Sequence, residues 1–194
     1  MRRICVFCGS NHGARGEYRE AAIKLAEALA ANRIGLVYGG ASVGLMGVIA
    51  NTALRCGGEV VGVIPRRLVD RELAHRGLSA LHQVDSMHER KAMMADLSDG
   101  FVTLPGGFGT LEEFTEVMSW RYLGIHQKPC GLLNIGGYYN GLLRFLDYAV
   151  DQGFIKAEHR GNILVEEEPA RMVERIARNF TAPNAEWPAR RAQT

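Results

Sequence analysis

Short apolar runs alternate along the chain with longer segments in which apolar residues recur every three or four positions. The short runs are typical of buried strands, and they lie at residues 4–7, 34–38, 59–64, 82–84, 101–104, 129–133 and 163–165. The longer segments have the period of helices that pack by one face, and the clearest lie at residues 21–32, 87–96, 110–123, 138–151 and 169–179. This alternation predicts an α/β, Rossmann-like fold: a doubly wound, mostly parallel sheet of about six to seven strands with helices on both faces.

Length and composition narrow the class of protein. The chain has 194 residues, of which 47% are hydrophobic and 23% charged, which fits one globular domain. We expect that domain to span residues 1–180 and a flexible tail, rich in proline and arginine, to occupy residues 181–194. The net charge of +2 and the dispersed arginines do not predict a nucleic-acid partner. No apolar run reaches bilayer length, so we expect no membrane partner and a cytoplasmic location.

The glycine-rich and cysteine-containing segments exclude several common sites. The loop 39–47 lacks the Gly-x-Gly-x-x-Gly spacing and follows the second strand, which disfavours NAD. The chain has no Gly-Lys-Ser/Thr, so it is not a P-loop NTPase. Cys5 and Cys8 are three positions apart in a predicted strand and therefore point to opposite faces, which favours buried thiols over a redox pair. The spacing of the four cysteines predicts no metal site.

The segment from Pro105 to Glu113 carries the strongest chemical signal. Pro105 ends a strand, and the glycines at 106, 107 and 109 let the backbone turn tightly and approach a ligand. Thr110 is the predicted N-cap of the next helix, whose free N–H groups and dipole favour an anion such as phosphate. Glu113 has two interpretations: it completes a capping box with Thr110, or it is a carboxylate placed beside the anion.

These residues resemble a known family. The pattern Pro105-Gly106-Gly107-x-Gly109-Thr110-x-x-Glu113 is similar to the signature of the "Lonely guy" (LOG) cytokinin-activating phosphoribohydrolases. Two further stretches agree with that family, the glycine loop at 39–47 and Met-His-Glu-Arg-Lys-Ala at 87–92. The likeness runs from about residue 5 to residue 169. By spacing alone, Arg90 and Lys91 would be exposed helical charges.

The resemblance implies an activity and a set of site residues. A LOG protein hydrolyses the N-glycosidic bond of AMP or an N6-modified AMP to a free base and ribose 5-phosphate, needs no cofactor or metal, and is expected as a homodimer. The resemblance gives catalytic roles to Arg90 and Glu113 and places the phosphate at residues 107–110. The implied substrate-binding residues are Ser10, Glu72, Lys91, Gly107, Phe108, Gly109, Thr110, Leu111, Glu112 and Ser119.

Two other functions compete with this one. Members of the family are commonly labelled lysine decarboxylases, but that reaction needs pyridoxal phosphate on a Schiff-base lysine. Nothing in the sequence marks Lys24, Lys91, Lys128 or Lys156 for that role. The alternative is a non-catalytic nucleotide-binding or sensing protein of the same fold, against which the presence of both Arg90 and Glu113 argues. The apolar side chains of Met94 and Trp120 are candidates to lie near a substituent on the base.

Overall fold

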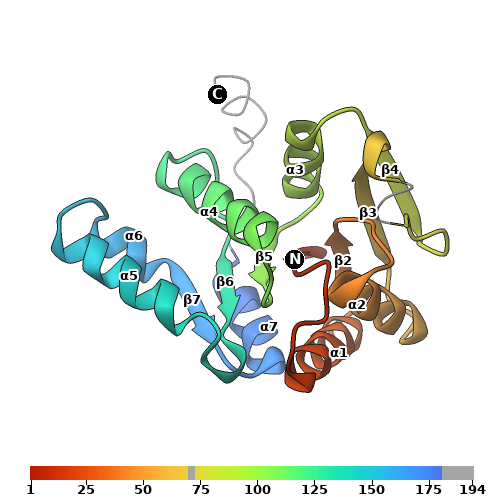
Figure 1. The fold of residues 1–194 in the computed structure, drawn as a ribbon, viewed down its shortest axis with the longest axis horizontal. Coiled ribbons are helices and arrows are strands. Elements are labelled where there is room, and N and C mark those ends of the chain that lie inside the picture. Colours follow the sequence, from red (N-terminus) through yellow and green to blue (C-terminus); the bar gives the residue numbers. More distant parts are fainter. Residues whose placement is uncertain (70–72, 181–194) are drawn as a thin grey trace.

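The computed structural model describes residues 1–69 and 73–180. In this part of the chain seven strands form one sheet in the order β4-β3-β2-β1-β5-β6-β7, and every neighbouring pair is parallel (Figure 1). The strands are β1 (Arg3–Phe7), β2 (Gly35–Tyr38), β3 (Val60–Pro65), β4 (Ala80–Val84), β5 (Gly100–Thr103), β6 (Cys130–Leu133) and β7 (Ile163–Glu166). The predicted doubly wound α/β fold is confirmed, and the sheet is wholly parallel.

Helices cover both faces of the sheet (Figure 1). On one face lie α1 (Gly16–Ala31), α2 (Gly44–Arg55) and α7 (Pro169–Arg178), whose apolar side chains share a core cluster with the strands. On the other face lie α3 (Met87–Asp96) and α4 (Phe108–Tyr122). The helix α5 (Asn140–Asp151) packs against α4 and β6, and the short α6 (Ala157–Gly161) follows it. Short 3-10 turns lie at Arg66–Leu68 and Ile135–Gly137.

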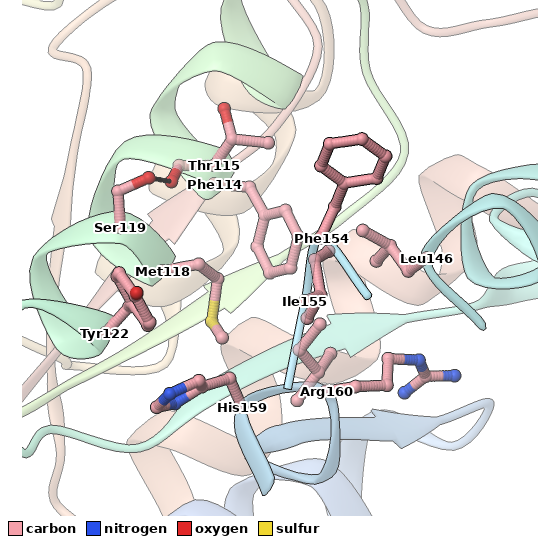
Figure 2. Close-up of a pocket in the computed structure, with 11 residues that line it drawn as sticks. Phe114, Thr115, Met118, Ser119, Tyr122, Leu146, Phe154, Ile155, His159 and Arg160 are labelled. Carbon is pink, nitrogen blue, oxygen red and sulfur yellow. Dashed lines mark hydrogen bonds between the residues drawn. The ribbon is translucent and has the colours of Figure 1, made fainter. Parts of the chain in front are cut away.

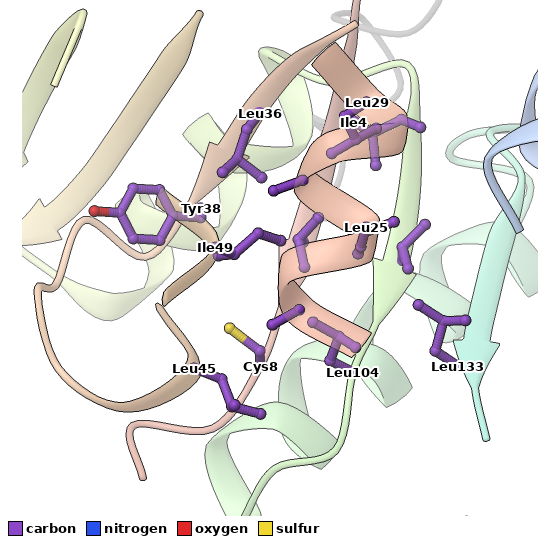
Figure 3. Close-up of a cluster of buried hydrophobic side chains, with 14 of the residues drawn as sticks. Ile4, Cys8, Leu25, Leu29, Leu36, Tyr38, Leu45, Ile49, Leu104 and Leu133 are labelled. Carbon is purple, nitrogen blue, oxygen red and sulfur yellow. The ribbon is translucent and has the colours of Figure 1, made fainter. Parts of the chain in front are cut away.

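The larger core cluster fills the space between β1, β2 and helices α1 and α2 (Figure 3). Leu25 and Leu29 extend from α1 onto the sheet, where Ile4 and Leu36 meet them, and all four are at most 1% exposed. Burying one such side chain contributes about 1.5–3 kcal/mol relative to leaving it in water. The predicted apolar stripe of the first helix is therefore the face that fixes α1 on the sheet.

The direction of the strand order reverses between β1 and β5. From β1 the chain builds β2, β3 and β4 outward on one side, and β5, β6 and β7 continue on the other side. The loops after β1 and β5 consequently diverge from adjacent strand ends, which is where open parallel sheets bind ligands. The two loops touch, because the Gly9 amide donates to the Pro105 carbonyl at 3.1 Å.

Some expectations differ from the structure or lie outside it. The five-residue helix α6 was not predicted, because so short a segment contains too few apolar positions to show a period. The predicted tail at 181–194 lies outside the described residues. Within the described ranges, no helix combines the length and the apolar character needed to cross a bilayer. The cytoplasmic location stays a prediction.

Candidate active site

A pocket of about 180 Å³ opens at the point where the strand order reverses. Its walls come from the ends of β1 and β2, the buried face of α3 and the first turns of α4. The lining residues are Val6, Phe7, Cys8, Ser10, Gly39, Met46, Arg90, Met94, Gly107, Phe108, Gly109, Thr110 and Glu113. The structure therefore brings together both predicted catalytic residues, the predicted phosphate-binding segment 107–110 and Ser10.

The N-cap of helix α4 lies three residues earlier than predicted. Its N-cap is Gly107, and Leu111 donates the first helical hydrogen bond to the Gly107 carbonyl at 3.1 Å. Thr110 is therefore not the N-cap and lies within the first turn, where its side chain is only 4% exposed. The capping-box interpretation of Glu113 is wrong for the same reason, since Glu113 lies a further turn into the helix. Glycine tolerates the N-cap geometry almost as well as threonine, so the earlier start costs little.

The early start of α4 adds donors to the pocket. The first N–H groups of a helix have no acceptor within it, and here they belong to residues 107–110, all of which line the pocket. The glycine at 106 allows the approach, because a Cβ there would lie 2.1 Å from Thr110 Oγ1 and 2.9 Å from the Gly9 amide nitrogen. Phe108 is 93% exposed at the mouth of the pocket. A glycine-rich helix start of this kind favours an anionic group.

Arg90 is buried in the wall of the pocket, only 5% exposed, and the expectation of an exposed charge was wrong. Its Nε donates to the Val63 carbonyl at 3.1 Å and its Nη2 to the Gly39 carbonyl at 2.8 Å. Gly39 directly follows β2 and Val63 lies within β3, so the backbone of two neighbouring strands holds the guanidinium plane. A cation fixed in this way presents a constant geometry to a ligand in the pocket.

Glu113 reaches the same pocket from the second turn of α4. Nearby, the Cys8 thiol is buried, and burial, reinforced by the charge of Glu113, raises the pKa of this thiol far above its usual range. Cys8 therefore stays protonated and is not a nucleophile. Among the described residues that line the pocket, the other titratable side chains are Arg90 and Glu113.

Lys91 and Glu112 meet each other beside the pocket. The Lys91 ammonium is 8% exposed, which again corrects the expected exposure, and it donates to Glu112 and, at 3.0 Å, to Glu116. Burial alone would lower the pKa of Lys91, but the bonds to these two carboxylates outweigh it and raise the pKa. This cluster ties α3, which carries Arg90, to α4, which carries Glu113. A direct contact of Lys91 or Glu112 with substrate stays a prediction.

The other predicted substrate-binding residues are less directly placed. Leu111 packs its side chain against the core cluster around Phe114, and its amide closes the first turn of α4. Ser119 donates to the Thr115 carbonyl at 2.8 Å and lines a second, apolar pocket of about 260 Å³ between α4 and the α5–α6 region (Figure 2). Glu72 lies outside the described residues. Of the two apolar candidates, Met94 lines the pocket that contains Arg90 and Glu113. Trp120 is partly buried on α4 and packs against the core cluster on that face of the sheet.

Gly39, Met46 and Cys8 line the pocket although the sequence analysis gave them no site role. Gly39 is the clearest omission, since a Cβ at this position would lie 2.2 Å from Arg90 Nη2. The sequence did indicate that Gly39 lies at the carboxyl edge of the sheet, because this residue directly follows a predicted strand. What could not be read was that Arg90, 51 residues further along, comes to rest against it.

Comparison with known proteins places this chain in a family. The family model described as "Possible lysine decarboxylase" matches residues 46–176. The probable cytokinin riboside 5'-monophosphate phosphoribohydrolase LOGL2 of Oryza sativa subsp. japonica is 50% identical over 176 residues, which cover 91% of this chain and 72% of that protein. The cytokinin riboside 5'-monophosphate phosphoribohydrolase LOG5 of Arabidopsis thaliana is 54% identical over 160 residues, 82% of this chain and 70% of that protein.

Solved structures share the fold at much lower identity. The molybdenum cofactor carrier protein from Chlamydomonas reinhardtii superposes with a TM-score of 0.70 at 20% identity, covering 92% of this chain and 97% of that one. The molybdenum cofactor binding protein from Rippkaea orientalis gives 0.69 at 20% identity over the same shares. At such identity only the fold is shared. The identity to the curated relatives is much higher, at 50% and 54% over most of the chain. The chain therefore belongs to the LOG family of cytokinin riboside 5'-monophosphate phosphoribohydrolases.

Proposed function

We propose that this protein hydrolyses the N-glycosidic bond of AMP or N6-modified adenosine 5'-monophosphates, releasing the free base and ribose 5-phosphate. The observation that carries this proposal is the convergence of Arg90, Glu113 and the glycine-rich start of α4 on one pocket. Membership of a family whose curated relatives are named for this reaction supports it. The description "Possible lysine decarboxylase" names a different chemistry, whereas Lys91, which follows Arg90 in α3, is ion-paired to two carboxylates.

Each part of the pocket has a role in this reaction. The N–H groups of residues 107–110 and the positive end of α4 hold the 5'-phosphate. Breaking the bond from sugar to base leaves an oxocarbenium-like sugar, which the Glu113 carboxylate stabilises while it orients the attacking water. The departing base gains negative charge, which the fixed guanidinium of Arg90 stabilises. Ser10 lines the pocket from the loop after β1, and in this proposal it contacts the substrate.

The proposal is tested by incubating the purified protein with AMP, N6-isopentenyl-AMP and other nucleoside monophosphates and separating the products by chromatography. Release of a free base together with ribose 5-phosphate supports the proposal. Binding of the nucleotides with no release of base supports instead the alternative of a nucleotide-binding or sensing protein. The buried, sheet-anchored Arg90 favours the enzyme, since a sensor has no need of a fixed cation beside a carboxylate.

A homodimer is proposed as the assembly. Large apolar side chains are exposed on α4, on α5 and just after each of these helices: Tyr122, Leu123, Phe145, Tyr148 and Phe154. Tyr122 and Phe154 also line the second pocket. An apolar patch of this kind is typical of an interaction surface, and a second copy of the chain is the occupant that the family resemblance suggests. Light scattering coupled to size exclusion checks the assembly, and a monomeric mass at working concentration would refute it.

A further inference from the structure

Three successive carbonyls in the segment between β5 and α4 accept hydrogen bonds from outside that segment. The Tyr139 hydroxyl donates to the Leu104 carbonyl at 2.7 Å, and the Gly9 amide donates to the Pro105 carbonyl at 3.1 Å. The Tyr138 hydroxyl donates to the Gly106 carbonyl at 2.6 Å. Two adjacent tyrosines just before α5 therefore hold the segment that carries the phosphate-binding residues.

These tyrosines are themselves firmly placed. Tyr139 is 1% exposed, and its amide donates to Asn134 Oδ1 at 2.7 Å. The ring of Tyr138 packs edge-on against Tyr139 and Tyr18, with centroid separations of 4.9 Å and 5.6 Å. The Tyr138 ring lines a hollow that adjoins the catalytic pocket and shares Ser10 and Gly107 with it. The hydroxyl of Tyr138 thus reaches the glycine turn from a fixed support.

Holding a carbonyl also aims an N–H group. In a planar trans peptide the C=O of one residue and the N–H of the next point in opposite directions. The bond from Tyr138 to the Gly106 carbonyl therefore turns the Gly107 N–H away from Tyr138. Without that bond the peptide between two glycines would rotate readily, because glycine has no Cβ to restrict it. The bond from Tyr139 has no such effect, since the Leu104 carbonyl shares its peptide with Pro105, which lacks an N–H.

We infer that Tyr138 is a positioning residue whose hydroxyl aims the Gly107 N–H at the phosphate of the substrate. The identity of the anion rests on the proposed function. The placement of the turn rests on the hydrogen bonds alone. Tyr138 does not line the catalytic pocket, so it acts through the backbone of Gly107 and not by touching the reacting atoms.

The test is the variant Tyr138→Phe, which keeps the ring contacts and removes only the hydroxyl. We expect the Kd of ribose 5-phosphate, measured by calorimetry, to rise about tenfold, as for the loss of one well-placed hydrogen bond. The Kd of adenosine, which has no phosphate, is expected to stay unchanged, and the KM for AMP to rise in step with the Kd of ribose 5-phosphate. A merely structural role would weaken the binding of adenosine and ribose 5-phosphate alike.

The matched control is Tyr139→Phe, the same chemical change one residue along. It leaves the buried Leu104 carbonyl without its donor, so we expect a lower Tm but a Kd for ribose 5-phosphate within about twofold of wild type. Wild-type affinity in Tyr138→Phe, or equal losses for adenosine and ribose 5-phosphate, would overturn the inference. If the wild type binds ribose 5-phosphate yet releases no base from AMP, the proposed function fails while the comparison of affinities still decides the role of Tyr138.

Discussion

Arg90 and Glu113 enter the pocket from different helices and are held by different means. Two backbone carbonyls, those of Gly39 and Val63, fix the Arg90 guanidinium. Glu113 is carried by α4, whose position relative to α3 is tied by the ion pairs of Lys91 with Glu112 and Glu116. A change at Arg90 therefore tests both its charge and its anchoring to these two carbonyls.

The variant Glu113→Gln keeps the size and shape of the side chain and removes its charge. Because Glu113 is not part of a helix cap, we expect the Tm to move little. The loss of a charge partner in the transition state is expected to lower kcat for AMP by about 10²-fold or more. Glu20→Gln, the same change on the exposed face of α1, is the control. Full activity of Glu113→Gln on AMP and on the best N6-modified substrate would show that the assigned mechanism is wrong.

The variant Arg90→Lys keeps the positive charge and loses the guanidinium fork. A single ammonium cannot reproduce the planar pair of bonds to the Gly39 and Val63 carbonyls while still facing the ligand. We expect kcat to fall by about 10²-fold while the Kd of ribose 5-phosphate stays near that of wild type. Steady-state kinetics and calorimetry measure the two quantities, with the exposed Arg178→Lys as control. An unchanged kcat would remove Arg90 from the mechanism.

At the scale of single residues, the sequence predicted the types of the site residues better than their structural surroundings. The acid, the arginine and the glycines were identified in the correct segments, because their order along the chain is visible. The burial of Arg90 was not, since its partners Val63 and Gly39 are 27 and 51 residues away in the chain. Tyr138 gave no site signal for the same reason, as it lies 32 residues from the carbonyl it holds.

The helix α4 is the element on which the site depends most. The position of its N-cap decides which N–H groups reach the pocket, and this N-cap is Gly107 and not the predicted Thr110. Sequence reasoning preferred threonine as N-cap because its side chain can bond the helix end. The structure instead buries Thr110 beneath the glycine turn, where packing against Gly106 outweighs that preference.

The variant Gly106→Ala tests the close packing of this turn. The new Cβ would lie 2.1 Å from Thr110 Oγ1 and 2.9 Å from the Gly9 nitrogen, so the turn must open. We expect a loss of about 1–3 kcal/mol in the free energy of unfolding, as for overpacked sites, together with a raised KM for AMP. Chemical denaturation and steady-state kinetics give the two values.

Its matched control is Gly141→Ala on α5, where a Cβ would meet no atom within 4 Å. Alanine is the better helix former there, so the free energy of unfolding is expected to rise by about 0.5–1 kcal/mol with unchanged kinetics. If Gly106→Ala keeps both the stability and the KM of wild type, the turn is not closely packed around Gly106.

At the scale of the whole molecule the topology assembles the site. The strand order places the ends of β1 and β5 side by side, so the loop with Ser10 and the turn before α4 meet without any local sequence signal. The parallel α/β architecture followed from the alternation of strand-like and helix-like segments, which long periodic stretches report reliably. This alternation did not predict which strand ends lie next to each other, because strand order is decided by packing between segments that are distant in sequence.

The stability of the whole fold is expected to depend on a buried histidine. His126, in the connection from α4 to β6, is 4% exposed and lies against Phe101. Its Nδ1 accepts from the Lys128 amide at 3.1 Å, and Nε2 lies 2.9 Å from the Val117 carbonyl, which fixes the neutral ring with its proton on Nε2. A second proton would have to displace the bond to Lys128.

Burial, with the nearby charge of Lys128, lowers the pKa of His126 from 6.5 to about 3. As pH falls from about 6.5 toward 3, the unfolded chain gains a proton at His126 that the folded chain resists, so the free energy of unfolding must fall over this window.

Glutamine can donate and accept at the same site but does not titrate. We therefore expect His126→Gln to be less stable at pH 7.5 and to lose less stability than wild type between pH 6.5 and pH 4. Urea denaturation at several pH values measures both slopes, and His88→Gln on the exposed face of α3 is the control. Parallel slopes for wild type and His126→Gln would mean that the buried imidazole does not set the acid sensitivity of this fold.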